Sequence, residues 1–152
     1  QYVAWGDQDC FQHLNNVLYA RYFESARLTW ITQLCQVSSL SQQLHDGLAR
    51  ARGLGMILAQ LNIKFRRPVV WPDTLLIAGE AVELEKDRFT IRAGMYSLKA
   101  WEDYLDKQNK GEAKRIPGPV ATADQICVTY DYDKLARADM PVELAEALRT
   151  YG

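Results

Sequence analysis

The stretch NVLYARYFESARLTWITQLC, residues 16–35, decides the fold class of this chain. Its apolar residues recur at helical spacing and Asn15 or Asn16 can cap the first turn, so the pattern predicts one long helix that ends at about Cys35. The first apolar row comprises Tyr19, Tyr22, Phe23, Ala26, Trp30 and Leu34. A second row widens this surface and comprises Leu28, Ile31 and Cys35. We therefore expect other elements to enclose the helix on more than one side.

Sequence patterns typical of strands precede and follow this helix along the chain. Residues 57–65 alternate apolar and polar side chains, which predicts a half-buried antiparallel strand with Ile57, Ala59, Leu61, Ile63 and Phe65 on its buried face. Further strands are predicted at residues 2–5, 74–85, 88–98 and 120–132, and shorter helices at 38–52 and 141–151. Because most strands have one apolar face, the predicted fold class is α+β, with an antiparallel β-sheet wrapped around one long central α-helix.

The length predicts a single domain over residues 1–152. One segment departs from the regular patterns: residues 101–118, WEDYLDKQNKGEAKRIPG, carry eight charges in eighteen positions. We expect this segment to be a flexible excursion at the tip of a hairpin.

Bulk composition excludes several classes of protein. Eighteen basic and nineteen acidic residues give a net charge of -1, so no overall field attracts nucleic acid or an anionic membrane. No apolar run approaches the roughly 20 residues of a membrane span. The cysteines are three in number and widely spaced, which favours a reducing compartment, the cytoplasm or an organelle such as the mitochondrion. Removal of an N-terminal leader is compatible with this expectation, because Gln1 leads directly into a strand-like stretch.

The run DQDCFQHLNN, residues 7–16, places two carboxylates, a thiol, an imidazole and two carboxamides before the long helix. Its spacing leaves three interpretations open: a polar turn in which Asp9 satisfies backbone amides, a general base or nucleophile at Asp9, and a Cys10–His13 nucleophilic pair. A metal site is not expected, because no further clustered ligand accompanies Asp7, Asp9 and His13.

Two segments resemble the signatures of a known family. WGDQDCFQHLNNVLYARYFESAR (5–27) and GLGMILAQLNIKFRRPVVWPDTLLI (53–77) are similar in order and spacing to the hotdog-fold acyl-CoA thioesterases of the 4-hydroxybenzoyl-CoA thioesterase type. The resemblance implies a hotdog fold and a homodimer, or a dimer of dimers, whose sheets join edge to edge. It implies hydrolysis of an acyl-CoA or acyl-carrier-protein thioester at the subunit interface. Coenzyme A enters as part of the substrate, and no cofactor is expected.

The resemblance also suggests roles for individual residues. The second aspartate of the family's D-x-D turn corresponds to Asp9, as nucleophile or as the base that activates water. His13 would orient the thioester carbonyl or carry a proton. The other expected substrate-binding residues are Asn15 and Asn16 at the turn, Tyr19 beside the acyl group, the amides of Gly55 and Met56 for the oxyanion, and Arg66 and Arg67 for the phosphates of coenzyme A.

One position departs from related sequences. Plant acyl-carrier-protein thioesterases carry an additional Asn two residues after the Asp, where this chain has Phe11. If that Asn polarises the substrate, this chain must use backbone amides instead. Two alternatives therefore stay open: a non-catalytic hotdog module that binds acyl thioesters or serves assembly, and a hotdog dehydratase acting on 3-hydroxyacyl thioesters.

Overall fold

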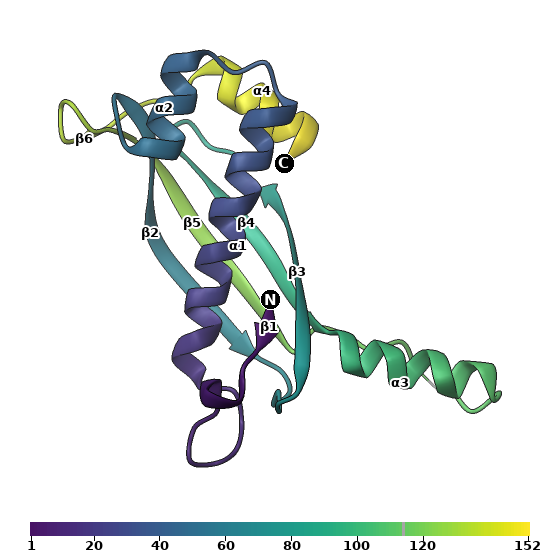
Figure 1. Cartoon of the computed structure of the whole chain (residues 1–152). Helices are drawn as coiled ribbons and strands as arrows, with labels where there is room; N and C mark the ends of the chain where they lie inside the picture. Colours follow the sequence, from purple (N-terminus) through teal and green to yellow (C-terminus); the bar gives the residue numbers. More distant parts are fainter. Residues whose placement is uncertain (114) are drawn as a thin grey trace.

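The computed structural model describes residues 1–113 and 115–152 and shows an antiparallel sheet with a long helix packed along it (Figure 1). The strand order is β1-β3-β4-β5-β2, and β6 pairs with β5. Helices α2 and α4 gather at one end of α1, whereas α3 projects away from the sheet near the other end (Figure 1). The elements are β1 (Tyr2–Val3), η1 (Trp5–Asp7), α1 (Asn16–Val37), α2 (Gln42–Arg50), β2 (Leu54–Phe65), β3 (Asp73–Val82), β4 (Arg88–Ser97), α3 (Leu98–Asn109), β5 (Ala121–Asp131), β6 (Ala136–Arg137) and α4 (Val142–Tyr151). This arrangement confirms the predicted α+β class.

Helix α1 forms where the apolar rows predict it and ends two residues beyond Cys35. Asn15 caps the helix, because its Oδ1 accepts a hydrogen bond from the N–H of Val17 at 3.2 Å. The first apolar row faces the sheet, but Leu28 of the second row is 54% exposed. The expectation of enclosure on more than one side is therefore wrong at Leu28. No helix among the described residues combines the length and apolar character that crossing a membrane requires.

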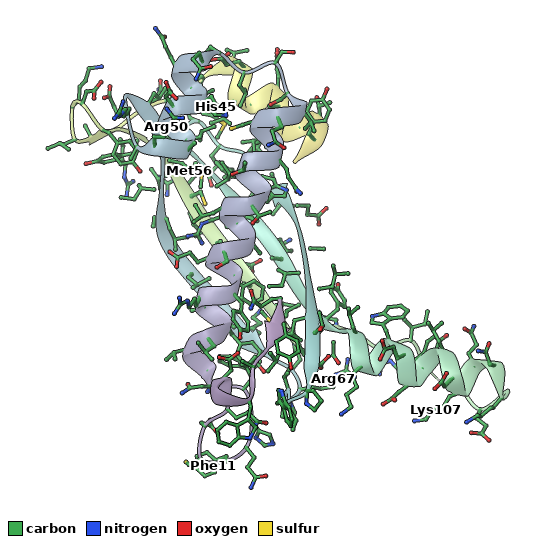
Figure 2. The ribbon with its side chains drawn as sticks, in the orientation of Figure 1. Phe11, His45, Arg50, Met56, Arg67 and Lys107 are labelled. Atoms are coloured by element: carbon green, nitrogen blue, oxygen red, sulfur yellow. The ribbon has the colours of Figure 1, made fainter. Side chains whose placement is uncertain are left out.

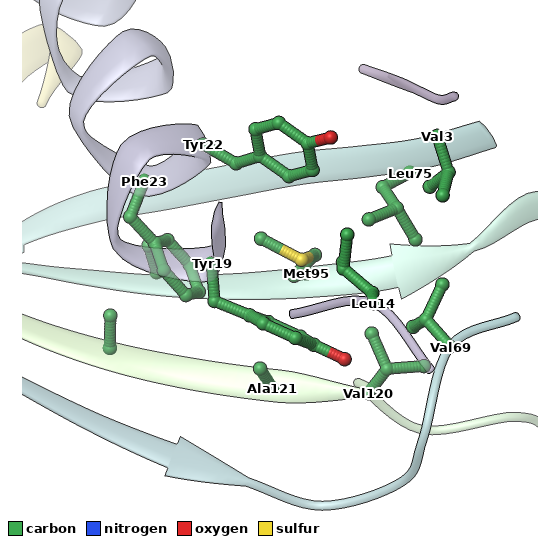
Figure 3. Packing of buried hydrophobic residues seen from close by; sticks show 12 residues of the cluster. Val3, Leu14, Tyr19, Tyr22, Phe23, Val69, Leu75, Met95, Val120 and Ala121 are labelled. Atoms are coloured by element: carbon green, nitrogen blue, oxygen red, sulfur yellow. The ribbon is translucent and has the colours of Figure 1, made fainter. Parts of the chain in front are cut away.

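The core between α1 and the sheet divides into two clusters. In the first, shown in Figure 3, aromatic side chains of α1 pack against buried residues of the sheet: the cluster includes Tyr19, Tyr22, Phe23, Leu75, Met95 and Ala121. In the second, Leu34 packs with residues from α2, α4 and the sheet, including Leu44, Phe89, Leu144 and Leu148. Full burial of a side chain such as Phe23 stabilises the fold by about 1.5–3 kcal/mol.

Strand β2 does not follow the single alternation that the sequence predicts. A β-bulge between Leu58 and Gln60 shifts its register against β5. The residues that contact the core are Met56 and Leu58 before the bulge and Leu61 and Ile63 after it. The prediction that Ile57 and Ala59 face the core is wrong, because the extra residue at the bulge exchanges the two faces of the strand.

Strand β2 also leaves one edge of the sheet open. It is 12 residues long and pairs with β5 on one side. No described strand pairs with its other edge. An unpaired edge presents backbone N–H and C=O groups that can pair with another chain.

The segment 101–118, predicted to be a flexible excursion, begins within a helix. Ser97 caps α3, because its Oγ accepts a hydrogen bond from the N–H of Ala100 at 3.0 Å. The buried Asp73 in turn accepts hydrogen bonds from Ser97 Oγ at 2.6 Å and from the N–H of Lys99 at 3.2 Å. The segment connects the paired strands β4 and β5, and residues 101–109 of it belong to the helix α3, because a carboxylate from β3 fixes the start of that helix. Lys114 lies outside the described residues, and flexibility beyond α3 stays a prediction.

Candidate active site

Asp9 lies in a tight turn that its own side chain stabilises. Its Oδ1 accepts a hydrogen bond from the N–H of Phe11 at 2.8 Å, and its backbone N–H donates to the carbonyl of His13 at 2.9 Å. Gln12 completes the turn with a positive φ of 61°. Oδ2 of Asp9 makes no hydrogen bond with any described residue, so the turn holds the carboxylate by one oxygen and leaves the other available.

Asp7 joins this turn to α1. Its Oδ2 accepts hydrogen bonds from the hydroxyl of Tyr22 at 2.6 Å and from the N–H of Ala4 at 2.8 Å. Burial raises the pKa of Tyr22, and the hydrogen bond to Asp7 and its charge raise that pKa further, so the hydroxyl stays protonated and donates. Oδ2 of Asp7 therefore accepts two hydrogen bonds that join the turn to α1, whereas the carboxylate of Asp9 accepts one, from within its own turn.

The other polar residues of the turn take different positions. Asn15 caps α1 and donates its backbone N–H to the carbonyl of Asp7 at 2.9 Å. Asn16 is the exposed first residue of the helix. His13 and Cys10 are exposed, and neither side chain makes a hydrogen bond with a described residue. The described residues contain no group of three or more His, Cys, Asp or Glu that could hold a metal ion.

The connection between β2 and β3 packs against this turn. The N–H of Leu14 donates to the carbonyl of Val69 at 2.8 Å, and the N–H of Trp71 donates to Gln8 Oε1 at 3.0 Å. Nearby, the ring of Tyr19 meets Phe65 edge-on with centroids 5.1 Å apart. Tyr19 is 2% exposed, so within this protomer it is a core residue. Arg66 and Arg67 are exposed at the end of β2, two to three residues before Val69.

Gly55 and Met56 lie at the opposite end of the molecule from Asp9. Both are at the start of β2, where Gly55 pairs with Tyr130 and the carbonyl of Met56 accepts a hydrogen bond from Tyr132 at 2.8 Å. Figure 2 shows Met56 and Phe11 near opposite ends of α1. Since a strand of this length spans about 36 Å, a single protomer does not bring these amides to Asp9.

A hollow of about 460 Å³ separates α1 from β3. Its walls include Tyr22, Ala26 and Trp30 of α1 and Leu75 and Ile77 of β3, with Ile91, Ala93 and Gln125 from the neighbouring strands. Tyr22 places one end of the hollow next to Asp7 and therefore next to the turn. The hollow is mostly apolar, as a site for an acyl group would be.

Arg27 contributes a buried cation to this hollow, a role that the sequence patterns did not indicate. Its side chain is 6% exposed and donates from Nη1 to Oε1 of the buried Gln125 at 2.5 Å. Its Nη2 lies 3.8 Å from a carboxylate oxygen of Glu24. The available signal was its spacing, because Arg27 follows Phe23 by four residues and so shares the buried face of the helix.

Comparison with known proteins assigns the family. The model of the thioesterase-like superfamily matches residues 3–148. The chain belongs to this superfamily. Membership identifies it, in general terms, as a thioester hydrolase. The sequence matches no protein of curated function.

Solved structures share the fold of this member of the superfamily. The 1,4-dihydroxy-2-naphthoyl-CoA thioesterase of Synechocystis superposes with a TM-score of 0.69 at 16% identity, covering 99% of this chain and 93% of its own. A gentisyl-coenzyme A thioesterase superposes with a TM-score of 0.68 at 14% identity, and the match covers 97% of this chain and 96% of the thioesterase. A thioesterase superfamily protein from Jannaschia sp. CCS1 superposes with a TM-score of 0.69 at 15% identity, and the match covers 99% of this chain and 79% of the Jannaschia protein. These similarities confirm the predicted hotdog fold.

Proposed function

We propose that this superfamily member hydrolyses an acyl-CoA or acyl-carrier-protein thioester and that Asp9 is its catalytic carboxylate. The observation that carries the proposal is the state of Asp9: one oxygen is fixed by the N–H of Phe11 and the other has no partner among the described residues. Such a carboxylate is positioned without an ion pair to any cation in the part of the chain that the structure describes. Asp7, by contrast, is engaged by Tyr22 and Ala4.

Two routes use this carboxylate. As a general base, Asp9 accepts a proton from water while the water oxygen attacks the thioester carbon; the C–S bond then breaks and the leaving thiolate takes up a proton. As a nucleophile, Asp9 attacks the same carbon, the C–S bond breaks, and the thiolate leaves and takes up a proton. Water then hydrolyses the resulting acyl-enzyme anhydride, which releases the acid and restores the Asp9 carboxylate. His13 is close in the turn and is the proposed proton carrier or carbonyl donor in either route.

The oxyanion donors are proposed to come from a second copy of the chain. Antiparallel pairing of two β2 edges about a two-fold axis near Ala59 would place Gly55 and Met56 of the partner next to the Phe65 end of the first protomer. That end packs on Tyr19 and adjoins the turn of Asp9. The open edge of β2 supports this homodimer, whose mass would be 34.8 kDa, twice 17.4 kDa. Further pairing into a dimer of dimers is compatible with the same edge contact.

The acyl group is proposed to enter the hollow between α1 and β3. Tyr22, Ala26 and Trp30 line it on the helix side. Tyr19, Tyr22 and Phe23 all belong to the core cluster, but of these three only Tyr22 also lines the hollow. The binding residues expected from the sequence therefore divide: Tyr22 takes the acyl-facing role expected of Tyr19, and Asn15 and Asn16 serve the helix start.

A thiol-release assay tests this function. Aliphatic and aromatic acyl-CoAs and the corresponding acyl-carrier-protein thioesters would be offered to the protein, with sedimentation to measure its mass. We expect release of free thiol from at least one series and a dimer in solution. Binding of acyl thioesters without thiol release would support the non-catalytic module instead. Loss of water from a 3-hydroxyacyl thioester, with the thioester intact, would support the dehydratase.

A further inference from the structure

The projecting helix α3 forms one wall of a second hollow, separate from the one between α1 and β3. Its other walls are residues 112–113 and 115–119 of the returning segment and the end of β2, and its volume is about 930 Å³. Figure 2 shows Arg67 between Phe11, on the turn of Asp9, and Lys107 on α3. The volume falls at the upper end of the range for small-molecule sites, about 300–1,000 Å³.

Among the described residues, four cations line this hollow: Arg66, Arg67, Lys107 and Arg115. None of them forms an ion pair with a described residue. Only two acidic side chains, Asp103 and Glu112, share the lining. Elsewhere on the described surface, cations such as Arg88 and Arg92 are paired with carboxylates. The hollow therefore concentrates unpaired positive charge on a chain whose net charge is -1.

The walls are also held in place. Arg67 donates a hydrogen bond from Nη2 to the carbonyl of Gly118, which ties the returning segment to the end of β2. At the base of α3, Asp73 fixes Ser97 and the N–H of Lys99. A site whose walls are fixed in advance loses less conformational entropy when a ligand binds.

An aromatic ring faces the same space. Tyr104 lines the hollow and is supported by Trp101, whose ring meets it edge-on with centroids 5.9 Å apart and planes at 83°. Pro117, Pro119 and Ile116 add apolar surface. Cations for phosphates together with an aromatic ring for a base are the groups that a nucleotide requires.

The hollow lies close to the turn of Asp9, because Arg67 is only two positions along the chain from a residue that contacts the turn segment. Arg67 is two residues before Val69, or about 7 Å of extended backbone, and the carbonyl of Val69 accepts the N–H of Leu14. A ligand with phosphates at Arg66 and Arg67 could therefore reach the turn with a flexible arm.

We propose that the hollow between α3 and the end of β2 binds the phosphorylated adenosine of coenzyme A. This inference rests on the proposed hydrolysis of acyl thioesters and selects coenzyme A as the carrier. It extends the phosphate contacts expected of Arg66 and Arg67 to Lys107 and Arg115, with Tyr104 stacking on adenine. A concave site of this size suits a nucleotide better than the broad surface of a carrier protein.

Calorimetric titration with adenosine 3′,5′-bisphosphate tests the site without requiring turnover. The variant is Arg66→Glu with Arg115→Glu, which leaves the Arg67–Gly118 contact intact. We expect its Kd to rise at least tenfold, and binding to the wild type to weaken as salt increases. The matched control is Arg149→Glu, an exposed charge reversal on α4 at the other end of the molecule, with an unchanged Kd. An equal Kd in the double variant and the wild type would overturn the proposal.

Kinetics separates this proposal from the proposed function. The double variant should raise KM for an acyl-CoA at least tenfold and leave KM for the same acyl group on pantetheine unchanged. If acyl-CoA is hydrolysed with the same KM by both proteins, the nucleotide site is wrong and the thioesterase assignment stands. If the double variant impairs only acyl-carrier-protein hydrolysis, the hollow docks that protein instead. A further outcome is possible: the wild type binds the nucleotide, the double variant does not, and neither protein hydrolyses any thioester. That result would support the nucleotide site and contradict the proposed function.

Discussion

Replacement of Gly47 by alanine should destabilise the protein, although helix propensity predicts the opposite. Gly47 lies within α2, where alanine is favoured over glycine by about 1 kcal/mol. In the folded chain, however, α2 crosses the start of β2 in backbone contact. A β-carbon on Gly47 would lie 1.7 Å from the carbonyl oxygen of Leu54 and 2.4 Å from its carbonyl carbon.

The size of the effect follows from this contact. The two backbones must separate by at least 1.3 Å, the difference between 1.7 Å and the 3.0 Å that real contacts keep. Gly55 faces the same crossing, since a β-carbon there would lie 2.2 Å from the carbonyl oxygen of Gly47. Because backbone cannot rotate away as a side chain does, we take a strain of about 3 kcal/mol, at the upper end for overpacking. After subtraction of the propensity gain, the net loss is about 2 kcal/mol.

Thermal unfolding followed by circular dichroism checks this prediction. For a chain of this length, about 2 kcal/mol corresponds to a fall in Tm of about 4–8 °C. The matched control is Ala49→Gly, an exposed position of the same helix, which should lower Tm by about 2–4 °C through propensity alone. A Tm for Gly47→Ala equal to or above that of the wild type would refute the close crossing of α2 and β2.

Two further predictions concern buried polar groups. Burial raises the pKa of Cys127 to about 11 from 9.0, so the folded state requires the protonated thiol; its contribution is complete below pH 9 and is lost as pH rises towards 11. Urea unfolding at pH 8 and pH 10 should therefore show a loss of stability that is greater in the wild type than in Cys127→Ala, by on the order of 1 kcal/mol, and equal losses would contradict this account. The second prediction concerns the buried hydrogen bond between Arg27 and Gln125. Each single variant, Arg27→Met or Gln125→Leu, should lower the free energy of unfolding by about 1–3 kcal/mol because it leaves the other polar group unpaired, whereas the double variant should recover much of that loss. Additive losses in urea unfolding would show that the two side chains are not coupled.

Periodicity predicted the parts of the fold that depend on local sequence. The first apolar row of residues 16–35, and the alternation at Leu61 and Ile63 in β2, follow from which face of each element is buried. The bulge near Ala59 was not visible in the sequence, because it depends on pairing with β5, whose residues facing the bulge lie 66 to 69 positions further along the chain. The helix α3 was missed for a similar reason, because its start is fixed by Asp73, which lies on β3 and is distant in the sequence. Its own charged composition is typical of a solvated loop.

The candidate site was predictable to the extent that it lies within one turn. Residues 7–16 are contiguous, so the spacing of Asp7, Asp9 and Asn15 indicated a turn followed by a helix cap. The residues of the buried pair Arg27–Gln125 are 98 positions apart in the sequence. The sequence indicated only that Arg27 lies on the buried face of α1 and gave no sign of its partner. The wide separation of Gly55 from Asp9 follows from the length of β2, which residue patterns alone do not relate to the position of the turn.

The central claim is that the carboxylate of Asp9 carries the hydrolysis, and Asp9→Asn tests it most directly. The amide keeps an oxygen that can accept the N–H of Phe11, so the turn should stay folded while the negative charge is lost. In a thiol-release assay on the best acyl thioester, we predict that kcat falls by about 10²–10⁴ with Tm unchanged, while the neighbouring Cys10→Ala keeps its activity. Turnover that survives in Asp9→Asn and disappears in Cys10→Ala would contradict the account.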